Sequence, residues 1–207
     1  MATVGDLVRS ARKLARNDVP DTAAILTALQ GAEAIAVSAR DWHEVGRGYE
    51  YYLADGEAAR RCLERSLDEQ SSDEIDVWTY KILTRICCER LEEPSKAREV
   101  LQRLEGDIER LERRHTYYLC EAAGCYSELL QDTEKARAVL KRALTYVTPI
   151  DRQAVDDLCE VARAHWEHLQ DEERALDLLQ EAASLARSPK AASDRDVSEW
   201  WHLANVY

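Results

Sequence analysis

Apolar residues recur along the chain with the spacing of amphipathic helices, and one combination of polar and apolar positions occurs four times. In each copy an Asp or Glu is followed four residues later by Ala and eight residues later by Leu. A carboxylate at the first position can accept hydrogen bonds from the free N–H groups of a helix start, so we predict a helix beginning at each acidic residue. The copies are Asp55–Ala59–Leu63, Glu93–Ala97–Leu101, Asp132–Ala136–Leu140 and Asp171–Ala175–Leu179.

A second helix is predicted upstream of each copy. Seventeen residues before each alanine lies a large residue, and offsets of 3, 4 and 7 from it complete one face of an α-helix. The residue at offset 4 is always small, which predicts a close approach of two backbones with an aromatic ring of a neighbour packed across the gap. The four faces are Trp42–Val45–Gly46–Tyr49, Tyr80–Leu83–Thr84–Cys87, Leu119–Ala122–Ala123–Tyr126 and Leu158–Val161–Ala162–His165.

This helix–turn–helix unit repeats at a nearly constant period, since the four alanines are 38, 39 and 39 residues apart. The pattern resembles the tetratricopeptide repeat, which places Trp, Leu, Gly and Tyr at the same first-helix offsets; the resemblance covers roughly residues 41–207. Two features differ: the period exceeds the family's, which is about 34 residues, and the first helix lies one residue further from the turn. The resemblance implies an all-α fold, a right-handed α-solenoid of about five antiparallel helix hairpins plus a C-terminal helix.

We predict a single helical-repeat domain over residues 1–207. No run of β-branched and aromatic residues bounded by turn residues indicates a strand, and no proline falls inside a predicted helix. The predicted parts are an N-terminal capping hairpin (1–40), four repeats (41–74, 75–114, 115–150 and 151–190) and a terminal half-repeat (195–207).

The C-terminal residues repeat the first-helix pattern without a second helix. This segment either caps the stack as a lone helix or belongs to a longer array. A lone cap would leave Trp201 or Tyr207 partly exposed, and an exposed aromatic patch favours self-association.

Charge and cysteine content narrow the function classes. The chain has 40 acidic and 28 basic residues, a formal charge of −12, so phosphate backbones would be repelled and nucleic-acid binding is not expected. No stretch approaches the roughly 20 apolar residues that span a bilayer, and the first residues lack the apolar core of a signal peptide. We therefore expect a cytoplasmic protein, without membrane association, whose six cysteines are reduced and buried.

The resemblance also implies where a partner binds. In tetratricopeptide-like stacks the first helices line the concave surface, and offsets 1, 2, 5 and 9 point into it. Three arginines in register would suit bidentate capture of carboxylates. Alternatively, the interleaved glutamates neutralise them, and the groove lining is only self-paired. The predicted concave-face residues are Arg47, Arg85, Arg163, Glu44, Glu121, Glu160 and Tyr51.

The sequence also contains partial patterns of metal ligands. Glu112–His115 and Glu199–His202 have the Glu-x-x-His spacing of di-iron ligands, but two further inward glutamates would be required. The cysteines lack the paired spacing of zinc ligands, and His165 is expected to be a core histidine bonded to a neighbour. No nucleophile elbow or glycine-rich phosphate loop occurs. We predict no catalytic residue, no metal and no cofactor.

The expected function is that of a non-enzymatic scaffold or adaptor that binds a partner peptide or helix in its concave groove. One alternative is a structural protein that self-assembles through its aromatic C-terminal helix. An enzyme or a metal-binding helical protein is the third. The sequence does not identify the partner.

Overall fold

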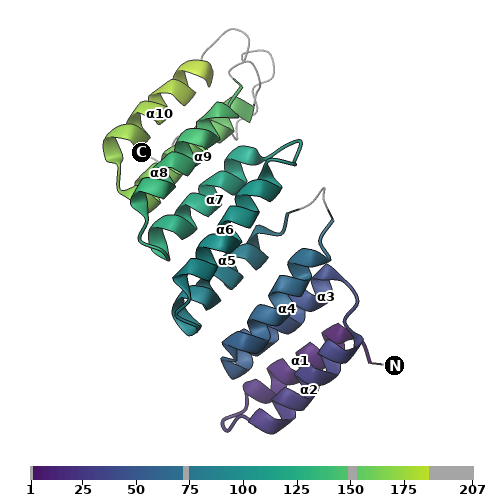
Figure 1. Cartoon of the computed structure of the whole chain (residues 1–207). Helices are drawn as coiled ribbons and strands as arrows, with labels where there is room; N and C mark the ends of the chain where they lie inside the picture. Colours follow the sequence, from purple (N-terminus) through teal and green to yellow (C-terminus); the bar gives the residue numbers. More distant parts are fainter. Residues whose placement is uncertain (1, 72–74, 149–152, 187–207) are drawn as a thin grey trace. The chain divides into compact units, whose positions relative to one another are not determined.

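A computed structural model describes residues 2–71, 75–148 and 153–186. All regular structure in these residues is helical and they contain no strand, which confirms the predicted all-α class (Figure 1). None of the described helices combines the length and apolar character needed to cross a membrane. The helices are α1 (Val4–Ala15), α2 (Thr22–Ile35), α3 (Ala39–Gly48), α4 (Gly56–Asp68), α5 (Val77–Arg85), α6 (Pro94–Ile108), α7 (His115–Glu128), α8 (Thr133–Thr145), α9 (Gln153–Leu169) and α10 (Glu172–Ala186), with π-helical turns η1 (Tyr49–Leu53) and η2 (Ile86–Arg90) continuing α3 and α5.

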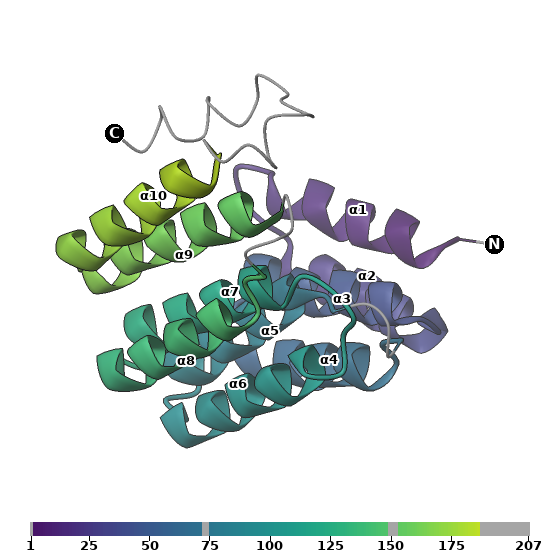
Figure 2. The ribbon, with the colours of Figure 1, turned by 90° about the horizontal axis from the view of Figure 1, so that it is seen from above.

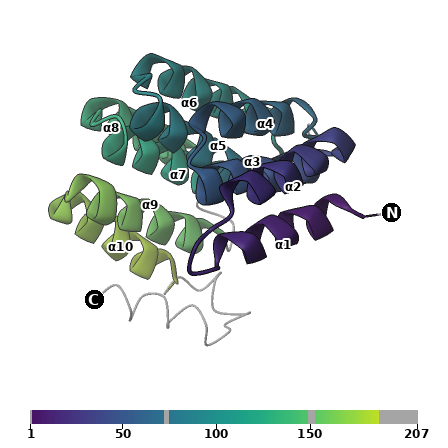
Figure 3. The ribbon, with the colours of Figure 1, turned by 90° about the horizontal axis from the view of Figure 1, so that it is seen from below.

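The chain divides into two compact units, Met1–Arg103 and Leu104–Tyr207, and α6 crosses the division. In the first unit α1 packs against α2 and α3 against α4, while α1 also contacts α3. In the second unit α7 packs against α8, α9 packs against α10, and α7 contacts α9; these pairs can be followed in Figures 2 and 3. The predicted repeat boundaries and the single domain over 1–207 stay predictions, and the half-repeat 195–207 lies outside the described residues.

The predicted apolar faces form the core of each unit. Every first-helix residue at offsets 0, 3, 4 and 7 is buried. The alanine and leucine of each second helix are at most 3% exposed. Because helix pairs can bury such faces only against each other, the helical periodicity read from the sequence is confirmed at these positions.

Gly46 marks a close approach between α3 and α4. A methyl group added there would lie 2.8 Å from Cγ of Leu63 and 3.2 Å from the backbone oxygen of Ala59. The close approach is therefore confirmed, but the predicted aromatic neighbour is wrong at this position. The gap is filled by Leu63, the leucine of the second helix in the same copy.

The turns in the four copies of the motif have the same construction. The N–H of each acidic residue donates a hydrogen bond to the C=O of the offset-7 residue six positions earlier, at 3.2, 2.7, 2.9 and 3.1 Å. The common helix-ending turn closes a ring that is one residue shorter. The extra residue noted in the sequence is thus absorbed by a wider turn, which in the first two copies becomes the π-helical turns η1 and η2. The residue before each acid has a positive φ: Ala54 (52°), Glu92 (55°), Gln131 (54°) and Gln170 (51°).

The acidic residues cap the second helices as predicted in three copies. Carboxylates of Asp55, Asp132 and Asp171 accept hydrogen bonds from the backbone N–H three residues later, at 3.0, 3.1 and 3.3 Å. In two places the acidic residue that begins one copy's turn motif also pairs with an arginine of the preceding copy. Arg60 lies 2.8 Å from Glu93, and Arg137 lies 2.6 Å from Asp171. Each of these arginines directly follows a buried alanine, so copies that are neighbours in sequence are also joined in space within each unit.

Candidate functional site

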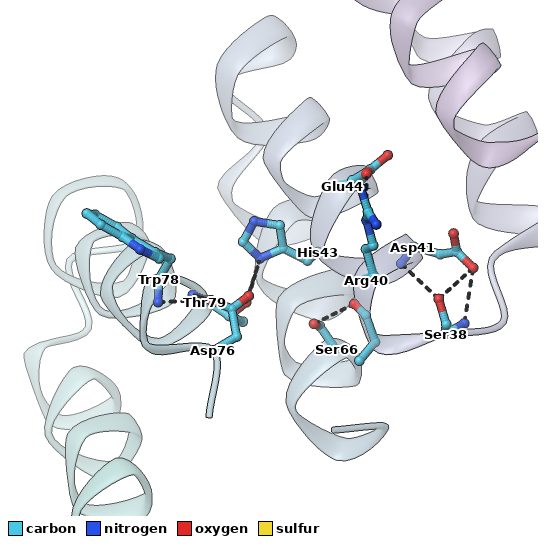
Figure 4. A network of polar contacts seen from close by, with 10 residues as sticks. Ser38, Arg40, Asp41, His43, Glu44, Ser66, Asp76, Trp78 and Thr79 are labelled. Atoms are coloured by element: carbon cyan, nitrogen blue, oxygen red, sulfur yellow. Dashed lines mark hydrogen bonds and ion pairs between the residues drawn. The ribbon is translucent and has the colours of Figure 1, made fainter. Parts of the chain in front are cut away.

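Side chains of α3 and η1 meet side chains of α5 at two places in the first unit. Near the start of α5, Nδ1 of His43 lies 2.5 Å from Oγ1 of Thr79 and 3.3 Å from Oδ2 of Asp76 (Figure 4). Asp76 also caps α5 by accepting hydrogen bonds from the N–H groups of Trp78 and Thr79. Burial lowers the pKa of His43 below its ordinary value of 6.5, because desolvation outweighs the attraction of Asp76. This contact fixes α5 beside α3.

The second place is built around Tyr51, whose ring is close to two arginines. The guanidinium carbon of Arg47 is 5.3 Å from the ring centroid, and that of Arg85 is 6.0 Å away. Nη2 of Arg85 also lies 3.5 Å from the Tyr51 hydroxyl oxygen, and this contact raises the pKa of Arg85. Tyr51 is nevertheless 54% exposed. Cation–π distances of this size hold the three side chains together while leaving the tyrosine accessible to a partner.

Arg47 and Arg85 form no ion pair with any carboxylate in the part of the chain that the structure describes. Arg85 feels the charges of Glu50 and Glu89 only at longer range. Arg47 is exposed, whereas Arg85 is half-buried. A guanidinium that contacts an aromatic ring and no carboxylate keeps N–H donors available for an outside carboxylate.

Arg163 in the second unit is bound differently. It pairs with Glu160 and with Glu167, the latter at 2.6 Å, and lies 3.8 Å from Glu121. The hydrogen bond from Arg163 to Glu160 raises the pKa of the arginine. Glu44 likewise pairs within its own helix, 3.4 Å from Arg40. For Arg163, Glu121, Glu160 and Glu44, the arrangement matches the alternative of a self-neutralised lining.

Sequence reasoning missed Trp78. It is 59% exposed, and Nζ of Lys81 lies 4.9 Å from the centroid of its ring. Residues 78, 81 and 85 lie on one side of α5 because they are three and four positions apart. This spacing could have identified Trp78 from the sequence. We call the set Arg47, Tyr51, Trp78, Lys81 and Arg85 the basic–aromatic surface.

The metal-ligand and self-association candidates from the sequence have different outcomes. In residues 2–71, 75–148 and 153–186, no three His, Cys, Asp or Glu side chains cluster as metal ligands. His115 of the Glu112–His115 motif stacks on Tyr146, with ring centroids 4.3 Å apart. The motif Glu199–His202, and the self-association candidates Trp201 and Tyr207, lie outside the described residues.

The six cysteines all lie within the described residues and are unbonded thiols, four of them buried. Burial raises the pKa of Cys62 to about 12 and the pKa values of Cys87 and Cys159 to about 11. These three thiols are therefore protonated near neutral pH and are weak nucleophiles. The prediction of buried thiols is confirmed for Cys62, Cys87, Cys120 and Cys125, whereas Cys88 and Cys159 are half-buried.

His165 occupies the core, as predicted, but its Nδ1 has no hydrogen-bond partner within normal distance. Its Nδ1 lies 3.6 Å from Oδ2 of Asp171, which is beyond hydrogen-bond distance. The carboxylate instead binds Arg137 at 2.6 Å. Burial accordingly lowers the pKa of His165, and the ring is held neutral.

Comparisons with protein-family models, with curated proteins and with solved structures find no match for this chain. The likeness to tetratricopeptide repeats therefore depends on the residue pattern described above.

Proposed function

We propose that this chain is a non-enzymatic scaffold of the tetratricopeptide-repeat type, a right-handed α-solenoid of about five hairpins with a terminal helix, which binds a segment of a partner protein. The four turns of shared construction and the buried offsets support the repeat architecture. A cytoplasmic location is part of the proposal, supported by six unbonded cysteines.

The observation that carries the binding role is the basic–aromatic surface. Arginine, tyrosine and tryptophan are the residue types that dominate protein-binding energy, because they combine large contact area with directed hydrogen bonds. Here Arg47 and Arg85 have no intramolecular ion pair among the described residues, and the rings of Tyr51 and Trp78 are more than half exposed. A partner carboxylate would therefore gain a charge-assisted bond without first displacing a pair inside the protein.

The contrast with Arg163 supports the choice of Arg47 and Arg85 as the binding residues. A partner that approaches Arg163 must compete with Glu121, Glu160 and Glu167, whereas Arg47 and Arg85 require no such competition. The partner class that fits is a peptide segment with carboxylates and at least one apolar side chain, bound to the first helices of the first unit.

The proposal is tested with the full chain on an array of peptides that vary in acidic and aromatic content. We expect acidic peptides that contain an aromatic residue to bind, and the double variant Arg47→Ala, Arg85→Ala to weaken binding at least about tenfold. The matched control is Arg9→Ala, Arg110→Ala, which removes two exposed arginines elsewhere. Equal binding by both double variants would overturn the assignment of the surface.

A further inference from the structure

The second unit contains a cavity of about 420 Å³ at the first residues of α7. Its wall is formed by the chain that leads into α7, by the end of α8 with the residues that follow it, and by the start of α9. The volume lies in the range of small-molecule sites. We call it the α7 cavity, and its wall includes Arg113, Arg114, His115, Thr116 and Tyr146.

Helix α7 begins at this cavity without a side-chain cap. Its N-cap residue is Arg114, and a guanidinium has no acceptor to offer the free N–H groups of a helix start. The N–H groups of His115 and Thr116 have no acceptor among the described residues, and the first bond of the helix runs from the Tyr118 N–H to the Arg114 C=O at 3.2 Å. These donors lie at the positive end of the helix dipole, where an anion is stabilised.

The Thr116 side chain is a further donor without a partner. Only 2% of the residue is exposed, and it lines the cavity. Its hydroxyl forms no hydrogen bond with the part of the chain that the structure describes. Buried hydroxyls are normally hydrogen-bonded, because burial without a partner costs free energy. A ligand in the α7 cavity would provide that partner.

Two arginines lie at this helix start, although cations are unfavourable at the N-terminal end of a helix. Arg113 and Arg114 are exposed and form no ion pair with a carboxylate of residues 2–71, 75–148 and 153–186. Guanidinium groups bind phosphate through paired N–H donors. A phosphate group presents three strong acceptor oxygens, which suits donors that come from the helix start, from a hydroxyl and from two guanidinium groups.

Two carboxylates, Glu112 and Asp157, also line the cavity. Asp157 interacts with another group of the protein, so its charge is engaged. Glu112 is exposed and has no ion pair within the described residues, so it acts against a bound anion. No three His, Cys, Asp or Glu side chains of those residues are grouped as metal ligands, and the carboxylates therefore do not make this a cation site.

The rings of His115 and Tyr146 form a flat part of the wall. Their centroids are 4.3 Å apart and their planes differ by 3°, and both residues are half-buried. Aromatic side chains bind planar groups by stacking or by edge contacts. The cavity volume also far exceeds the roughly 30 Å³ of a water molecule, so an inorganic ion would leave most of it unfilled.

We propose that the α7 cavity binds a small phosphate monoester that carries a planar organic group. The phosphate lies at the start of α7, bound by the N–H groups of His115 and Thr116, the Thr116 hydroxyl and the guanidinium groups of Arg113 and Arg114. The planar group lies against the rings of His115 and Tyr146. A nucleic acid is not the ligand, because a chain of charge −12 repels a phosphate backbone. The site shares no residue with the basic–aromatic surface and is independent of the proposed scaffold role.

The test is calorimetric titration of the full chain with phenyl phosphate at constant ionic strength, up to about 10 mM ligand, a range that covers weak binding. Phenyl phosphate should bind, and inorganic phosphate should bind at least about threefold more weakly because it lacks the ring. Binding should shift the backbone amide NMR signals of His115 and Thr116. The proposal is overturned by absence of binding, by equal binding of inorganic phosphate, or by shifts confined to other residues.

Charge variants test the sign of the ligand. Arg113→Gln, Arg114→Gln should weaken phenyl phosphate binding at least about tenfold. The matched control Arg9→Gln, Arg174→Gln removes the same charge at exposed positions elsewhere and should bind like the wild type. Glu112→Gln removes an opposing carboxylate and should tighten binding about two- to fivefold. Equal weakening by the two double variants, or weaker binding by Glu112→Gln, would contradict a phosphate at this helix start.

The variant Thr116→Val separates ligand binding from folding, because valine keeps the shape of threonine and lacks the hydroxyl. The melting temperature of the free protein should not fall, since the hydroxyl has no partner to lose. Binding of phenyl phosphate should weaken at least about threefold, since a hydrogen bond to a charged group is lost. A lower melting temperature with unchanged binding would mean that the hydroxyl serves the fold, and it would overturn the proposed site.

Discussion

The glycines of this chain differ in what surrounds them, and the difference decides how each would respond to a side chain. At Gly46 a methyl group would meet the branch point of Leu63 and a backbone oxygen of α4, neither of which can rotate away. At Gly48 the nearest atom would be a terminal methyl of Leu29, which can move. Gly106 in α6 has nothing within 4 Å of the added carbon. Helix packing therefore constrains Gly46 most.

We predict that Gly46→Ala destabilises the protein by about 1–2 kcal/mol, because overpacking exceeds the gain of about 1 kcal/mol in helix propensity. Gly106→Ala serves as the control and should stabilise the protein by about 0.5–1 kcal/mol, since it gains propensity without a clash. Urea unfolding followed by circular dichroism measures both. Equal stabilisation by the two substitutions would show that α3 and α4 do not pack through Gly46.

At the scale of elements, the turn between paired helices is the most regular feature of the molecule. Its left-handed position is occupied by alanine, glutamate or glutamine, although glycine is the usual residue there because a Cβ makes the left-handed conformation unfavourable. The hydrogen bond from the following acidic residue, and the cap that this residue gives to the next helix, hold the turn in place. Each turn thus keeps a local backbone strain that its neighbours outweigh.

We predict that Gln170→Gly relieves this strain and stabilises the protein by about 0.5–1 kcal/mol. Lys141→Gly, at an exposed position inside α8, should instead destabilise it by about 1 kcal/mol, because glycine is a poor helix former. The melting temperatures of both variants show whether residue 170 has a left-handed or a helical backbone conformation. Loss of stability on Gln170→Gly would contradict the turn geometry.

The positions of the helices could be predicted from the sequence, whereas the residue contacts between helices could not. Asp55, Asp132 and Asp171 were recognised as caps because capping depends on local spacing. The extra residue before each turn was also visible, but its wide hydrogen-bonded ring was not, because no glycine marked the left-handed position. At Gly46 the facing residue depends on how two helices cross, so the sequence did not identify Leu63.

The candidate site was predictable to a similar degree. Arg47, Tyr51 and Arg85 were selected through the family resemblance, and the structure brings them together. Within the described residues, Arg47 and Arg85 lack ion pairs and Arg163 has them. This difference depends on where neighbouring glutamate side chains reach, which residue spacing alone does not determine. Trp78 was missed because it falls outside the offsets used, although it shares a side of α5 with Lys81 and Arg85.

At the scale of the whole molecule, the excess of acidic residues is the dominant electrostatic feature. The chain carries 40 acidic and 28 basic residues, so compact folding brings like charges together and destabilises the folded state. Ion pairs such as Arg103–Asp68 are largely exposed, and exposed pairs contribute little stability. Repulsion among the unpaired carboxylates should therefore outweigh the attraction within exposed pairs.

We predict that raising the NaCl concentration from about 10 to 300 mM raises the melting temperature, because the screening length falls from about 30 Å to less than 8 Å. Potassium chloride and tetramethylammonium chloride should have the same effect, since screening does not depend on the identity of the cation. Thermal melts at fixed protein concentration measure this. A melting temperature that falls with salt would mean that ion pairs outweigh the net repulsion.

The native cysteines can report transient opening of the helices that bury them. Alkylating reagents attack thiolates, so a buried protonated cysteine reacts only while its helix is transiently open. Cys62 and Cys87 lie in the first unit, and Cys120 and Cys125 in the second. Time-resolved alkylation read by mass spectrometry would give a separate opening rate for each position, without any foreign label.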